Sequence, residues 1–86
     1  MYKVQWKLLA RDRLADVWLQ ADDRAEVTAA VHEIDRALAA NPTVLGESRE
    51  GATRIMFEGT LGVTFEALED QGVVVVLTVW QVRRRH

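Results

Sequence analysis

The chain has 86 residues, of which 49% are hydrophobic and 28% charged, and it carries a formal net charge of −2. This length and composition predict a single globular domain over residues 1–86 and exclude a disordered chain. Because the sequence has no cysteine, it also excludes a disulfide scaffold and thiolate metal sites.

The sequence shows no sign of a membrane or secretion signal. No stretch approaches the roughly 18 consecutive apolar residues that a membrane span needs. The first residues, MYKVQWKLLARDR, lack the continuous apolar core of a signal peptide. We therefore expect a cytoplasmic protein that makes no use of a membrane.

The first predicted element is a strand over residues 2–8. Its side chains alternate between apolar and polar, which is the period of a strand with one buried face. The apolar face consists of Tyr2, Val4, Trp6 and Leu8.

A helix is predicted over residues 11–21, because there the period of the apolar residues changes from 2 to 3.6. The apolar stripe of this helix consists of Leu14, Val17, Trp18 and Ala21. We expect Trp6 in the preceding strand and Trp18 in this helix to pack in the core.

A second, longer helix is predicted to follow Asp23, since Asp23 and Glu26 fit a capping box at a helix N-terminus. It ends at Asn41-Pro42, because the residue before a proline is displaced from the helical region. Almost no residues join the two helices, so they should form an antiparallel hairpin. The apolar stripe of the second helix consists of Val27, Ala30, Val31, Ile34 and Leu38.

Three further strands are predicted in ATRIMFEG, TLGVTFEAL and VVVVLTVWQV, with turn residues at 69–72 before the last. They should form an antiparallel meander. The fold class is therefore α+β with the order β-α-α-β-β-β, in which the helical hairpin packs on one face of a mainly antiparallel four-stranded sheet. We expect the covered face to carry Phe57 and Phe65. In the third strand, one face is predicted to consist of Leu61, Val63, Phe65 and Ala67.

Pairing Glu58 with Leu61, and Leu68 with Val74, places Phe65 opposite Leu77. The helix-covered side of the last strand would then carry Leu77, Val79 and Gln81. Its other side would carry Val74, Val76, Thr78, Trp80 and Val82. An apolar face that no helix covers usually marks a protein interface. A register shifted by one residue would exchange the two faces.

Several motifs follow one another along the chain: YKVQW, A...L..VW, V..AV..IDRAL..NP, GESREG and VW.VRRR. Together they resemble the RelE/ParE superfamily of type II toxins, which includes plasmid stabilisation proteins. The resemblance implies a small toxin that arrests growth and is neutralised by a cognate antitoxin. RelE-like members cleave messenger RNA on the ribosome without a metal ion, whereas ParE-like members poison DNA gyrase by binding it.

The resemblance assigns candidate catalytic residues for the ribonuclease case. Arg54 matches a basic position on the second strand, and Arg83 matches one at the end of the fourth. The third-strand position, where the nucleases carry arginine, holds Leu61 or Gly62 here. No terminal tyrosine is present, so His86 is the candidate acid or base. The predicted pairing separates Arg54 from Arg83 by about 20 Å, too far to grip one phosphate.

The C-terminal RRRH carries a charge of +3, while residues 1–82 contain 8 basic and 13 acidic residues. One interpretation is a solubilising terminus. The other is a patch that binds nucleic acid or an acidic partner, with Trp80, Val82, Arg84 and Arg85 as partner-binding residues. An acidic body lacks the broad basic surface expected of a ribosome-directed nuclease.

The sequence therefore favours a ParE-like toxin that binds a protein target such as DNA gyrase and is neutralised by an antitoxin. We expect the Arg83-Arg84-Arg85 cluster and the exposed sheet face to dock on the target, with the antitoxin competing for that face. One alternative is a RelE-like endoribonuclease that acts on messenger RNA at the ribosome through Arg83, His86 and Arg54. The other is a non-toxic remnant of the fold. We expect no cofactor and no metal site, since neither His32 nor His86 has a second ligand at metal spacing.

Overall fold

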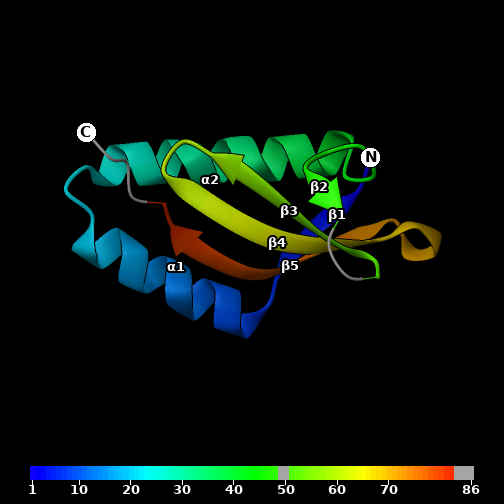
Figure 1. The fold of residues 1–86 in the computed structure, drawn as a ribbon, viewed down its shortest axis with the longest axis horizontal. Coiled ribbons are helices and arrows are strands. Elements are labelled where there is room, and N and C mark those ends of the chain that lie inside the picture. Colours follow the sequence, from blue (N-terminus) through cyan, green and yellow to red (C-terminus); the bar gives the residue numbers. More distant parts are fainter. Residues whose placement is uncertain (49–50, 83–86) are drawn as a thin grey trace.

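The structure, a computed structural model, describes residues 1–48 and 51–82 (Figure 1). Across these residues no helix is long and apolar enough to cross a membrane. The elements follow one another as β1 (Lys3–Trp6), α1 (Leu8–Gln20), α2 (Arg24–Ala40), β2 (Glu47–Ser48), β3 (Thr53–Glu58), β4 (Leu61–Leu68), a 3-10 turn (Glu69–Gln71) and β5 (Val73–Gln81).

The strands form one mixed sheet of five strands in the order β1-β5-β4-β3-β2. β1 runs parallel to β5, and the other neighbours are antiparallel. The prediction of an α+β fold is confirmed, but the prediction of four strands is wrong. The additional strand, β2, lies between α2 and β3 and has 2 residues, too few to show an alternating pattern.

The two helices begin and end for local reasons. α1 begins at Leu8, earlier than predicted, because residues 8–15 are mainly leucine, alanine and arginine, which favour helix. At the start of α2 the carboxylate of Asp23 accepts a hydrogen bond from the backbone N–H of Glu26 at 3.1 Å. α2 ends at Ala40, immediately before Asn41-Pro42, as predicted.

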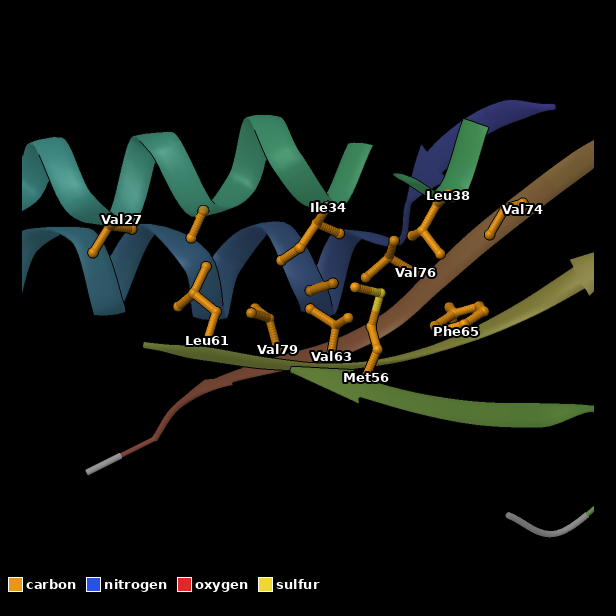
Figure 2. Close-up of a cluster of buried hydrophobic side chains, with 12 residues drawn as sticks. Val27, Ile34, Leu38, Met56, Leu61, Val63, Phe65, Val74, Val76 and Val79 are labelled. Atoms are coloured by element: carbon orange, nitrogen blue, oxygen red, sulfur yellow. The ribbon is translucent and has the colours of Figure 1, made fainter. Parts of the chain in front are cut away.

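The core lies between the helical hairpin and one face of the sheet (Figure 2). α2 contributes most of its predicted stripe, and the predicted face of β4 is buried as well. The buried side chains are Ala10, Val27, Ala30, Ile34, Leu38, Met56, Leu61, Val63, Phe65, Val74, Val76 and Val79. Burial of this apolar surface is the main force that holds the helices on the sheet.

Two of the three N-terminal predictions about packing are corrected. Trp6 does pack against the core, and its indole Nε1–H donates to Asp35 of α2 at 2.8 Å. Leu8 is 75% exposed, because it begins the helix instead of continuing the strand. Trp18 is 41% exposed and lies under the guanidinium of Arg24, 4.7 Å from its ring centre.

The predicted position of Phe57 in the core is wrong. Arg54 lies opposite Phe65, as predicted, so the alternation of β3 directs Met56 to the helices and Phe57 to the other face. Met56 is buried, whereas Phe57 is 59% exposed.

The predicted register of β5 holds only at its end. Leu61 lies opposite Gln81 as predicted, but Leu68 lies opposite Val73 and Phe65 opposite Val76. An irregularity in the pairing at Thr64 and Phe65 leaves one extra residue in β5, which has the form of a β-bulge. The bulge brings Val74 and Val76 into the core, contrary to prediction, together with Val79.

Candidate functional site

An aromatic pair lies on the sheet face that the helices leave open. Phe57 of β3, Gly62 of β4 and Trp80 of β5 form one row across the three strands. The rings of Phe57 and Trp80 meet edge to face, with centroids 6.1 Å apart and planes at 86°. The prediction that Trp80 faces away from the helices is confirmed. We call these two side chains the aromatic pair.

Gly62 is the residue that makes room for this arrangement. A Cβ atom built on Gly62 would lie 2.5 Å from Cε2 of Trp80, closer than real side chains approach. The indole therefore packs directly over the backbone of β4. Glycine in a strand interior often marks such a close approach.

The rest of the open face is only partly exposed. Next to the aromatic pair, the hydroxyls of Thr64 and Thr78 are hydrogen-bonded at 2.7 Å across β4 and β5. Val82, beyond the end of β5, donates its backbone N–H to the carbonyl oxygen of Thr60 at 2.7 Å. This bond fixes the end of β5 against the β3-β4 hairpin, beside the aromatic pair.

Arg54 lies on the opposite face of β3 and fastens a loop. Its Nε donates to the carbonyl oxygen of Leu45 at 2.7 Å, and its Nη2 donates to that of Gly46 at 3.2 Å. Its Nη1 donates to the hydroxyl of Ser48 at 3.1 Å. These bonds hold residues 45–48 against β3, and the structure does not bring Arg54 together with Trp80.

The other predicted site residues, Arg83, Arg84, Arg85 and His86, lie outside the described residues. Within the described ranges, no three side chains of His, Asp or Glu are close enough to hold a metal ion. Glu33 and Arg36, an exposed ion pair on α2, shift each other's pKa. A hydrogen bond from Arg36 lowers the pKa of Glu33, and the same bond raises the pKa of Arg36.

An apolar groove of about 470 Å³ lies between α1 and α2. Its lining is mostly aliphatic and aromatic, with Arg11, Thr28 and His32 as the polar members. The other lining residues are Leu14, Ala15, Trp18, Leu19, Val27 and Val31. We call this the hairpin groove.

The sequence contains a signal for the hairpin groove that the prediction of α1 missed. Ala15 and Leu19 are four residues apart, which aligns them on one side of a helix, next to the predicted apolar stripe. Both residues lie inside the helix predicted over residues 11–21, but the predicted stripe left them out. Leu19 is 61% exposed although it is apolar.

No family model matches the sequence, and no curated protein matches it significantly. Solved structures do match. A chain of the RelBE2 toxin-antitoxin complex from Mycobacterium tuberculosis has a TM-score of 0.76 at 23% identity, with 93% of this chain and 90% of that chain covered. A chain of the chromosomal ParDE system from P. aeruginosa has a TM-score of 0.65 at 15% identity, with 96% of this chain and 98% of that chain covered.

The isolated E. coli RelE toxin matches over the whole of this chain and 89% of its own length, with a TM-score of 0.62 at 13% identity. At these identities the likeness concerns the fold. All three matches extend over nearly the full length of both chains. The fold that the sequence motifs predicted is therefore confirmed: this chain has the fold of the RelE and ParE toxins.

Proposed function

We propose that this protein is the toxin of a type II toxin-antitoxin module, and that it acts in the ParE-like manner by binding a protein target such as DNA gyrase. The observation that carries the proposal is the aromatic pair over Gly62. By resemblance, a nuclease carries arginine at this position of the sheet. Cations there would stabilise the charged transition state of phosphodiester cleavage, and an aromatic surface cannot do so.

An aromatic surface on an open sheet face suits a protein partner. Tryptophan is among the residues that most often dominate protein interfaces, because it buries a large area with little loss of conformational entropy. We assign Trp80 as the anchor of target binding, with Val82 beside it and Arg84 and Arg85 as flanking charges.

The charge of the chain supports the same choice. The whole chain carries a net charge of −2, and residues 1–82, which hold 8 basic and 13 acidic residues, carry −5. Binding to nucleic acid depends on basic side chains that neutralise phosphates. The negative charge of residues 1–82 repels phosphates. The acidic body attracts basic groups on a protein partner, whereas Arg84 and Arg85 suit acidic groups on it.

We assign the hairpin groove to the antitoxin. Its floor is apolar over two helices, which is the geometry that accepts the apolar face of an amphipathic helix. Two of the matching structures are described as toxin-antitoxin systems. In this assignment Trp80 binds the target, the hairpin groove binds the antitoxin, and the two surfaces share no residue.

Tightly controlled expression of the chain, with and without its genomic neighbour, tests this proposal. Growth arrest with intact messenger RNA is expected, relieved by co-expression of the antitoxin. Trp80→Ala should abolish arrest while the variant still binds the antitoxin. If messenger RNA is cleaved, and replacing Arg83 and His86 stops the cleavage, the RelE-like activity is assigned instead. Harmless expression of a folded wild-type chain would indicate a remnant.

A further inference from the structure

The C-terminal half of β3 is an open edge of the sheet. β2 pairs only with Arg54 and Ile55, so among the described residues no strand lies beside Met56–Glu58 on that side. The chain leaves the edge at Gly46, which has φ +66° and passes so close to Ile55 that a Cβ would meet its carbonyl oxygen. Beyond this point the edge is not covered by a neighbouring strand.

The backbone of Phe57 presents one donor and one acceptor to this open edge. Glu58 and Leu61 close a two-residue hairpin in which Gly59 has φ +57°, as a type II′ turn requires. The closing pair of such a hairpin is hydrogen-bonded, and the pattern alternates along an antiparallel ladder. The N–H and C=O of Phe57 therefore point away from β4.

A pocket of about 470 Å³ lies along the same edge. Ala37 of α2, Leu45 and Met56 give it an apolar lining on the helix side of the sheet. On the other side of the edge, the ring of Phe57 lies exposed against Trp80. A strand laid beside Phe57 would direct one side chain into this pocket and the next onto the aromatic pair, because side chains alternate between the faces. We call the pocket the β3 edge pocket.

The two titratable side chains that line the β3 edge pocket are both carboxylates. Glu47 and Glu58 both line it. Arg36 of α2 is held by Glu33 at 2.6 Å and interacts more weakly with Glu58. The guanidinium of Arg54 lies beside the pocket, where it donates to the carbonyl oxygens of Leu45 and Gly46. An unpaired strand edge flanked by two carboxylates favours a partner with Lys or Arg beside its apolar residues.

We propose that an extended, basic segment of the protein target adds to the edge of β3 as a short strand. It pairs with the backbone of Phe57, places an apolar side chain in the β3 edge pocket and directs Lys or Arg toward Glu47 and Glu58. We infer that the target, and not the antitoxin, supplies this strand, because Phe57 belongs both to the open edge and to the aromatic pair assigned to target binding. In naming the target the inference rests on the proposed function. The hairpin groove shares no residue with the β3 edge pocket and stays free for the antitoxin.

The test is a titration of the whole labelled chain, followed by NMR, with the capped peptide Lys-Val-Arg-Val-Lys and with Glu-Val-Glu-Val-Glu. The basic peptide is expected to shift the amide resonance of Phe57 and the methyl resonance of Met56. The double variant Glu47→Lys, Glu58→Lys should weaken it roughly tenfold, since two exposed ion pairs become repulsive. The acidic peptide should then bind the variant better than the basic one.

A matched control separates this site from net charge alone. Glu69→Lys with Asp70→Lys makes the same change in charge on exposed residues of the 3-10 turn, and it should leave binding of the basic peptide within about twofold. Equal weakening by the two double variants, or shifts that leave Phe57 unmoved, would overturn the inference. Peptide binding at Phe57 by a chain that does not arrest growth would remove the target as the source and leave the docking site standing. Growth arrest by a chain that does not bind the basic peptide would overturn the docking site and leave the proposed function standing.

Discussion

Replacement of Gly62 by alanine should uncouple Phe57 from Trp80. The added Cβ would lie 2.5 Å, 2.6 Å and 2.8 Å from Cε2, Cζ2 and Nε1 of the indole. These three atoms belong to one rigid ring, so the whole indole must move by about 1 Å to regain ordinary van der Waals distances. The movement changes the edge-to-face contact with Phe57, which now has centroids 6.1 Å apart.

The free energy of unfolding is expected to change little in Gly62→Ala. An aromatic pair contributes about 0.5–1.5 kcal/mol beyond its buried area. Removing a glycine from a strand interior gains about 0.5–1 kcal/mol, so the two effects nearly cancel. The informative quantity is therefore the coupling between Phe57 and Trp80, not the stability itself.

A double-mutant cycle measures that coupling. Phe57→Ala, Trp80→Ala and the double variant are unfolded by urea, first in the wild-type background and then in Gly62→Ala. We expect a coupling of about 1 kcal/mol in the first background and less than about 0.3 kcal/mol in the second. The near-ultraviolet circular dichroism of Trp80 should change in parallel. An unchanged coupling in Gly62→Ala would refute the role assigned to Gly62.

Further predictions concern stability and antitoxin binding. Arg54→Ala should lower the free energy of unfolding by about 1–3 kcal/mol, since its guanidinium holds residues 45–48; a loss below about 0.5 kcal/mol would contradict this role. Asp23→Ala should cost about 1 kcal/mol through loss of the N-cap of α2, measured against Asp22→Ala as the neutral neighbour. Leu19→Asp should abolish antitoxin binding in a pull-down while the chain still arrests growth, whereas Leu9→Asp, an exposed apolar position outside the hairpin groove, should leave both intact.

Elements with a clear period were predictable from the sequence. In α2 the apolar residues recur every three or four positions between a capping residue and Asn41-Pro42, so both the ends and the buried face are those predicted. β4 alternates regularly, and the prediction of its buried face is likewise confirmed by Leu61, Val63 and Phe65. In both cases one face is distinctly apolar, which leaves a single way to bury it.

β5 could not be predicted to the same degree. Its first half, VVVV, is apolar at every position, so the pattern holds no information about which valines face the helices. The bulge reverses the alternation between Val76 and Val79, and nothing in a run of valines announces it. The direction of Phe57 followed from the pairing of Arg54 with Phe65, but its apolar character argued for the core.

The role of Arg54 was hidden for another reason. Its partners are two backbone carbonyls and a serine hydroxyl in a loop, and backbone carbonyls leave no mark in a sequence. A two-residue strand such as β2 is equally invisible. Contacts of this kind depend on how the loop returns to the sheet.

The parallel pairing of β1 with β5 implies an order of events during synthesis on the ribosome. Lys3 pairs with Val73, so β1 has no neighbouring strand until the last described strand has emerged. Pairing between such distant segments forms late, whereas helices form from local contacts. The hairpin groove is built from residues 11–32 alone. If the hairpin groove binds the antitoxin, as proposed, a nascent chain would offer this groove before Trp80 has been synthesised, so the antitoxin would bind before the proposed target surface is complete.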